Sequence, residues 1–102
     1  MPWYVYIAYF VAGFGLSNSV PHFVAGISGA RFQSPFADPP GKGESSAVVN
    51  VLWGFGNFAV GYILVTSLGD FKPGLTVDSL LVLSGALLSG ILGARHFSSV
   101  RN

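Results

Sequence analysis

The chain has 102 residues, of which 51% are hydrophobic and only 9% are charged, and its formal net charge is +1. A typical soluble domain carries roughly 25% charged residues, and a short soluble chain has a large surface to cover for its volume. The composition therefore excludes an ordinary soluble domain and favours lipid as the solvent. Because there is no run of Lys or Arg, nucleic-acid binding has no basis. The absence of cysteine excludes disulfides and thiolate sites.

Three long apolar runs follow one another along the chain. The first, from residue 1 to 30, holds no formally charged side chain, and at about 1.5 Å per residue it exceeds the roughly 30 Å hydrocarbon core of a bilayer. The second covers 45–69, and the third, 79–94, reaches spanning length when its flanks lie at the interfaces. Glycines that would weaken an aqueous helix are tolerated in lipid. The sequence predicts an all-α membrane protein, one domain over 1–102, with transmembrane helices at about 3–29, 45–68 and 76–97.

Polar residues, proline and glycine indicate where the helices begin and end. Ser45 and Ser46 are suited to cap the second helix, and Thr76 the third. Pro21 interrupts the first run and favours either a kink or a fresh helix start. We expect a long helix that is kinked but continuous, because the spacing of small residues keeps its register across the proline. The segment 31–44 is rich in Pro and Gly and is predicted to be a loop.

The distribution of basic residues predicts the orientation. With three spans, Lys72 lies on the side of the N-terminus, whereas Lys42 and the arginines lie on the other side. The positive-inside rule then places the long loop and the C-terminus in the cytoplasm and the N-terminus outside. The residues expected at the membrane surfaces are Trp3, Tyr4 and Tyr6 on the outer side, and Arg31, Phe32, Phe36 and Arg95 on the inner side.

Small and polar residues recur at steps of three and four in each predicted helix. In lipid they mark helix contacts, because small side chains let backbones approach and amides bond across to a neighbour. The third helix has two adjoining small faces, one more than an isolated three-helix unit needs, which indicates a further partner. The predicted interface residues are Ala8, Ala12, Gly15, Ser19, His22 and Gly26, then Asn50, Gly54, Asn57 and Gly61, and finally Ala86, Gly90 and Ala94, while Gly85, Ser89 and Gly93 form the adjoining face.

His22 and His96 are the two imidazoles of the chain and the candidates for a cofactor site. Both are expected near the loop-side ends of their helices, where two neutral imidazoles can bind haem iron axially. No Cys, Asp or Glu obviously completes a metal shell. We therefore expect His22 to be a hydrogen-bonded packing residue, with haem at His22 as the alternative. No metal or other cofactor is predicted apart from bound lipid. The segment 40–45 lacks the phosphate-loop pattern and Gly-x-Ser-x-Gly is missing, so no catalytic residue is predicted.

One segment carries a family resemblance. It comprises Val20-Pro21-His22-Phe23, then Gly26-Ile27-Ser28-Gly29, and then Phe32-Gln33-Ser34-Pro35-Phe36. This segment resembles short bacterial multi-span membrane proteins that share a VPHF…GISG…FQSPF segment, and the resemblance covers less than half of the chain. It implies a bacterial cytoplasmic membrane and carries no activity.

The predicted function is that of a non-enzymatic accessory or structural subunit, which packs against other membrane subunits or against copies of itself in a larger complex. A second hypothesis is a homo-oligomeric channel or solute transporter lined by the Asn50 and Asn57 face. Proton-coupled transport is disfavoured because no ionisable residue lies in the middle of a predicted span. A third hypothesis is a haem- or quinone-linked redox subunit that uses His22.

Overall fold

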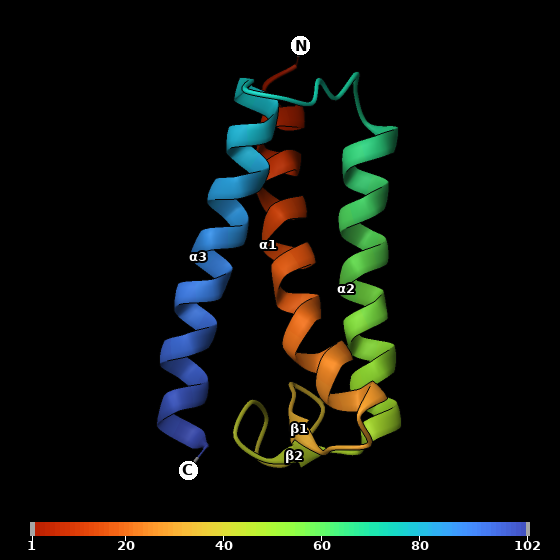
Figure 1. Cartoon of the computed structure of the whole chain (residues 1–102), viewed down its shortest axis with the longest axis vertical. Helices are drawn as coiled ribbons and strands as arrows, with labels where there is room; N and C mark the ends of the chain where they lie inside the picture. Colours follow the sequence, from red (N-terminus) through yellow and green to blue (C-terminus); the bar gives the residue numbers. More distant parts are fainter. Residues whose placement is uncertain (1, 102) are drawn as a thin grey trace.

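The computed structural model describes residues 2–101, and three long helices make up most of this part of the chain (Figure 1). Helix α1 spans Trp3–Ile27, α2 spans Ala47–Ser67 and α3 spans Val77–Val100. Each is long and apolar enough to cross a membrane. The prediction of an all-α membrane protein with three transmembrane helices is confirmed.

The two ends of the molecule differ in structure. At one end lie the N-terminus and the connection between α2 and α3, and at the other lie the C-terminus and the long α1–α2 loop (Figure 1). This loop contains a short antiparallel ribbon of β1 (Phe32–Gln33) and β2 (Glu44–Ser45), in which Phe32 pairs with Ser45. The ribbon was not predicted, because strands of two residues are too short to show an alternating pattern.

Side-chain caps begin the second and third helices. The Ser46 hydroxyl accepts a hydrogen bond from the Val49 amide at 3.2 Å, and the Thr76 hydroxyl accepts one from the Ser79 amide at 3.2 Å. Each bond satisfies one amide that the first helical turn leaves unpaired. Of the two serines predicted to cap α2, only Ser46 does so.

Helix α1 is continuous through Pro21. Proline lacks the amide hydrogen that would bond the carbonyl of Ser17, and its ring crowds the preceding turn, so a helix bends at such a point. The last turns of α1 lean towards α2 and away from α3 (Figure 1). The expectation of an uninterrupted first helix is met, and the bend leaves room between α1 and α3 at the loop end.

Helix α1 is the central element, because it packs against both other helices. On the α2 side, a Cβ atom added to Gly54 would lie 2.7 Å from the Phe23 nitrogen, and one added to Gly61 would lie 2.7 Å from Leu16 Cγ. On the α3 side, a Cβ atom at Gly85 would overlap the carbonyl oxygen of Phe10. Glycine at these positions lets the helix backbones touch, as is common in membrane proteins.

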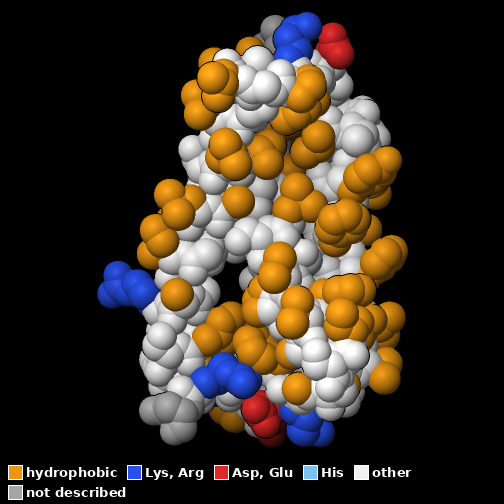
Figure 2. All heavy atoms as spheres, viewed as in Figure 1, with side chains coloured by type: hydrophobic (Ala, Val, Ile, Leu, Met, Phe, Trp, Pro, Cys, Tyr) orange, Lys and Arg blue, Asp and Glu red, His pale blue; other side chains and the backbone are white. Residues whose placement is uncertain are grey.

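Apolar side chains cover the outer surface of the helices, and most of the charged side chains gather at the two ends (Figure 2). This distribution suits a chain surrounded by lipid along its length and by water at its ends. The exposed apolar side chains include Ile7, Val11, Leu52, Phe55, Leu83, Leu87 and Ile91.

Replacing Gly85 with Ala is expected to lower the free energy of unfolding by about 1–3 kcal/mol, because the new methyl group forces α1 and α3 apart. Gly56→Ala is the matched control, since nothing lies within 4 Å of a Cβ atom there. Alanine is also favoured over glycine in a helix by about 1 kcal/mol. Reversible unfolding in mixed micelles, followed by circular dichroism, measures both variants. Equal stability of the two would contradict the close α1–α3 contact.

Candidate functional site

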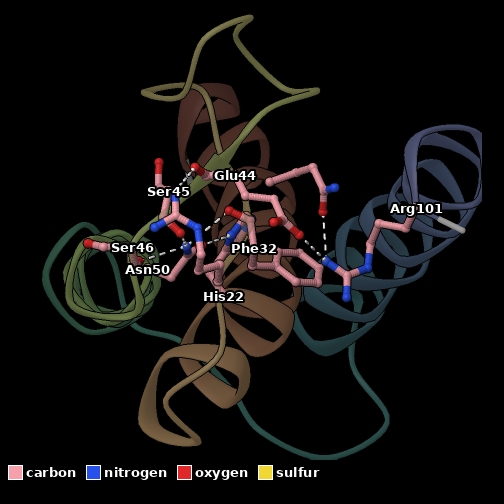
Figure 3. A network of polar contacts seen from close by, with 9 residues as sticks. His22, Phe32, Glu44, Ser45, Ser46, Asn50 and Arg101 are labelled. Atoms are coloured by element: carbon pink, nitrogen blue, oxygen red, sulfur yellow. Dashed lines mark hydrogen bonds and ion pairs between the residues drawn. The ribbon is translucent and has the colours of Figure 1, made fainter.

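A cluster of buried polar side chains lies where the loop meets the helices (Figure 3). His22 comes from α1 and Asn50 from α2, while Gln33, Ser34 and Ser45 come from the loop and its ribbon. All five are buried, and Asn50 is completely inaccessible. Burying a polar group is costly unless it forms hydrogen bonds, so the partners of these side chains define the site.

The amide of Asn50 is the centre of this cluster. Its Nδ2 lies within hydrogen-bond distance of three carbonyl oxygens, those of Phe32 at 3.1 Å, Ser45 at 3.2 Å and Ser46 at 3.1 Å, so one of its two hydrogens is shared between two of them. Carbonyl oxygens only accept, so the nitrogen of the amide must face them. The amide oxygen consequently faces His22, whose Nδ1 lies 2.9 Å away (Figure 3). One side chain thus joins α1, α2 and both strands of the ribbon.

The contact with Asn50 fixes the protonation pattern of the His22 ring. Because Asn50 Oδ1 can only accept, Nδ1 of His22 carries a hydrogen and donates it, and in the neutral ring Nε2 keeps a lone pair. No hydrogen bond to Nε2 is formed by residues 2–101. The ring is held edge-on by Phe32 and Phe97, with centroid distances of 5.3 Å and 5.9 Å. His22 is therefore a rigid side chain with one unused acceptor.

The C-terminal end of α3 is attached to the ribbon by Arg101. Its guanidinium donates to Gln33 Oε1 at 2.8 Å, lies 3.7 Å from a carboxylate oxygen of Glu44, and sits 4.4 Å above the ring of Phe32 (Figure 3). An exposed ion pair contributes little by itself, but stacking of a guanidinium on an aromatic ring adds to it. His96 of α3 also reaches the loop, since its Nε2 donates to the Gly41 carbonyl at 2.6 Å.

A second amide pair lies deeper in the helices. Asn57 Nδ2 donates to the carbonyl of Trp53 at 2.8 Å, so Asn57 Oδ1 faces α1 and accepts from Asn18 Nδ2 at 3.1 Å. Asn18 is thereby oriented as well, and its oxygen has no partner among the described residues. Both asparagines of α2 are bonded to α1 within the chain.

A pocket of about 350 Å³ adjoins His22. Its walls are Asn18 and His22 of α1, Trp53 of α2, His96 and Phe97 of α3, and loop residues between 33 and 41. The space-filling view shows a gap between α3 and α1 on the side of the loop end (Figure 2). The volume is at the small end of the range for ligand pockets, and no charged residue lines it. The pocket exists because Pro21 bends α1 away from α3.

The interface residues predicted for α1 and α2 lie on the faces where these two helices meet. A Cβ atom at Gly15 would lie 3.2 Å from the Asn57 carbonyl, and one at Gly26 would lie 2.6 Å from the Ala47 carbonyl. Buried members of the predicted set are Ala12, Ser19, His22, Gly26, Asn50, Gly54 and Gly61, and half-buried members are Ala8, Gly15 and Asn57.

The contact face of α3 differs from the predicted one. Gly85 and Ser89 are buried against α1, whereas Ala86 is half-buried and Gly90 and Ala94 are exposed. Within the chain, α3 therefore contacts α1 through the adjoining face, and the row of Ala86, Gly90 and Ala94 remains a prediction for a contact outside the chain. The sequence could not choose between two small faces, because the choice depends on which backbone of α1 comes near.

Most of the predicted surface residues are exposed, but Phe32 is corrected to an inward position. Its ring packs between His22, Phe97 and Arg101. Sequence reasoning did not identify Asn18, although an intramembrane amide one turn before His22 was a usable signal. The predicted surface residues that are exposed are Trp3, Tyr4, Arg31, Phe36 and Arg95, and Tyr6 is half-buried.

Neither a group of metal-binding side chains nor a comparison with known proteins assigns a function to the site. Within residues 2–101, no group of three or more His, Cys, Asp or Glu side chains is placed to hold a metal ion. No protein-family model, curated protein or solved structure matches the chain. The chemistry of the site therefore rests on its own residues.

Replacing Asn50 with Leu is expected to destabilise the chain by about 2 kcal/mol, since a membrane hydrogen bond contributes about 0.6 kcal/mol on average and Asn50 forms four. Asn57→Leu removes two bonds and should cost about half as much. Hydrogen exchange separates the two effects, because only Asn50→Leu should accelerate exchange of the amides in 31–46. Equal exchange in both variants would show that Asn50 does not hold the loop.

Proposed function

We propose that this protein is a small, non-enzymatic accessory subunit of a larger assembly in a bacterial cytoplasmic membrane. Its three helices occupy most of the chain, and one long loop and one short connection join them. The observation that carries the proposal is a row of small residues on α3, Ala86, Gly90 and Ala94, that the internal packing does not use.

The packing within the chain does not require glycine at position 90. A Cβ atom at Gly90 would find a single neighbour, the Ser17 hydroxyl, at 3.9 Å, whereas one at Gly85 would collide with the backbone of α1. Gly90 and Ala94 line a groove of about 420 Å³ between α1 and α3. Small residues on a membrane helix let another helix approach closely. The row supports a transmembrane helix of another subunit lying along this groove.

The asparagines support a subunit in preference to a channel. A polar pathway along α2 requires amides that are free to contact the passing solute. Asn50 is completely buried and bonded to His22 and the loop, and Asn57 is bonded to Asn18 and the carbonyl of Trp53. Haem at His22 is also disfavoured, since a macrocycle of four pyrroles needs a wider slot than a pocket of about 350 Å³.

Replacing Gly90 with Leu should release the partner without disturbing the fold. In mild detergent, the wild-type chain is expected to migrate as an assembly larger than one chain in its micelle, and Gly90→Leu as the single chain. Ser84→Leu is the matched control, because it adds the same side chain at an exposed position on another face of α3. Circular dichroism should be the same for all three proteins. An assembly that survives Gly90→Leu, or a wild type that migrates alone, would refute the proposal.

The proposed orientation places the long loop in the cytoplasm and the N-terminus outside, following the excess of basic residues at the loop end. The chain has no cysteine, so a single introduced thiol reports cleanly. A thiol at Lys42→Cys, in the loop, should resist a membrane-impermeant maleimide added to intact spheroplasts, and one at Lys72→Cys should react. The opposite pattern would invert the orientation.

A further inference from the structure

Two hydrogen-bond acceptors in the pocket beside His22 form no hydrogen bond with residues 2–101. One is His22 Nε2, and the other is the side-chain oxygen of Asn18. The two residues are one helical turn apart, so their side chains lie on the same face of α1 with roughly 5–6 Å between Cβ atoms. Both line the pocket.

A flip of the His22 ring or of the Asn18 amide would break the hydrogen bonds that orient them, so neither acceptor can be replaced by a donor. Three carbonyl oxygens orient the Asn50 nitrogen, so the Asn50 oxygen accepts from Nδ1–H of His22. The neutral His22 ring then has its lone pair on Nε2. The carbonyl of Trp53 holds the Asn57 nitrogen in the same way, which directs Asn57 Oδ1 to Asn18 Nδ2. A ligand that matches this face of α1 must supply hydrogen-bond donors, and hydroxyl groups are one such donor.

The remaining walls favour a flat, uncharged ring. The rings of Trp53 and Phe97 line the pocket together with His22, whose centroid lies 6.4 Å from that of Trp53 and 5.9 Å from that of Phe97. No Lys or Arg lines it, so a phosphate headgroup would find no counter-charge. A cavity of about 150 Å³ is enough for benzene, and about 350 Å³ leaves space for a substituted ring.

A second, mainly apolar hollow lies on the other side of Trp53 from the pocket's remaining walls. Trp53 lines both the pocket and this hollow of about 360 Å³ between α1 and α2. This hollow is walled mainly by apolar residues, among them Val11, Phe14 and Val60. A hydrocarbon tail attached to a ring in the pocket can lie there without exposing polar groups to lipid.

We propose that this pocket binds the head of a lipid-soluble quinol, an aromatic ring with two hydroxyl groups carried on an apolar tail. One hydroxyl donates to His22 Nε2 and the other to the oxygen of Asn18. The ring packs against Trp53 and Phe97, and the tail lies in the hollow beside Val11 and Val60. The proposal concerns binding alone and is tested on the chain without a partner, since Asn18 and Phe97 also line the groove proposed for the partner helix.

The test uses the full chain in lipid nanodiscs with a decyl-substituted 1,4-dihydroxybenzene as the probe. Trp3 is exposed at the opposite end of α1, so a Trp3→Phe background leaves Trp53 as the one fluorophore of its kind. The emission of Trp53 should change saturably with the probe. The dimethyl ether of the probe cannot donate and should bind about 10-fold more weakly, the effect of losing one or two hydrogen bonds.

The decisive variant is His22→Asn. The amide nitrogen of asparagine takes the place of Nδ1 and keeps the bond to Asn50, but nothing replaces Nε2. The affinity for the probe should fall about 3- to 10-fold, while the affinity for the dimethyl ether should not change. Asn18→Ala removes the second acceptor and should act in the same direction, so a failure of His22→Asn to fold does not end the test.

Three results would overturn the proposal. They are the absence of a saturable change in Trp53 emission, equal affinities of the wild type for the probe and its dimethyl ether, and a preference for the probe that survives both variants. Each is read from one titration series on the chain without a partner.

Discussion

The loop end of this protein depends on one buried amide. Asn50 is completely inaccessible, and its nitrogen and oxygen contact four groups from α1, α2 and the ribbon. In a membrane protein, hydrocarbon drives no association between helices, so packing and hydrogen bonds must do so. The loop is polar and rich in Pro and Gly. Its only regular structure in the described residues is a ribbon of two strands, each two residues long. Its attachment therefore comes from Asn50, with Arg101 and His96 adding contacts from α3.

The two halves of the bundle are held by different means. Away from the loop, backbone contacts at Gly85 and Gly61 bring α3 and α2 onto α1, and packing of this kind needs no polar group. Near the loop, the bend at Pro21 takes α1 away from α3, and close packing gives way to aromatic rings, amides and a pocket. Membrane helices tolerate proline in general, because neighbouring helices, side chains and waters can satisfy the freed backbone group. The position of Pro21 thus sets where α1 separates from α3.

The sequence was sufficient for the helices and for one of the two contact faces of α1. Apolar length identifies a transmembrane helix reliably, because lipid requires every backbone group to be bonded internally. The face through Ala12, His22 and Gly26 could be predicted because its small and polar residues recur at regular steps of three and four. The second face, through Phe10 and Gly13, could not be predicted from the sequence. Phe10 has a large side chain, so nothing in the sequence indicated that its backbone carbonyl contacts Gly85. The partners of His22 and Asn50 were also out of reach, since they are 28 residues apart and are joined through loop carbonyls. That His22 forms a hydrogen bond inside the bundle did follow from the cost of burying an imidazole in lipid.

Attachment of the loop and the chemistry of the pocket are coupled through the same amide. If the ribbon were detached from the helix ends, Asn50 would lose the carbonyls of Phe32 and Ser45 and keep only that of Ser46. Its amide would then be less constrained to present an oxygen to His22, and the lone pair on Nε2 would no longer be fixed by the fold. A molecule that bonds to Nε2 gains most when the loop is closed, so its binding must stabilise the closed loop by the same free energy. The loop, though remote from Nε2 along the chain, is in this sense part of the site.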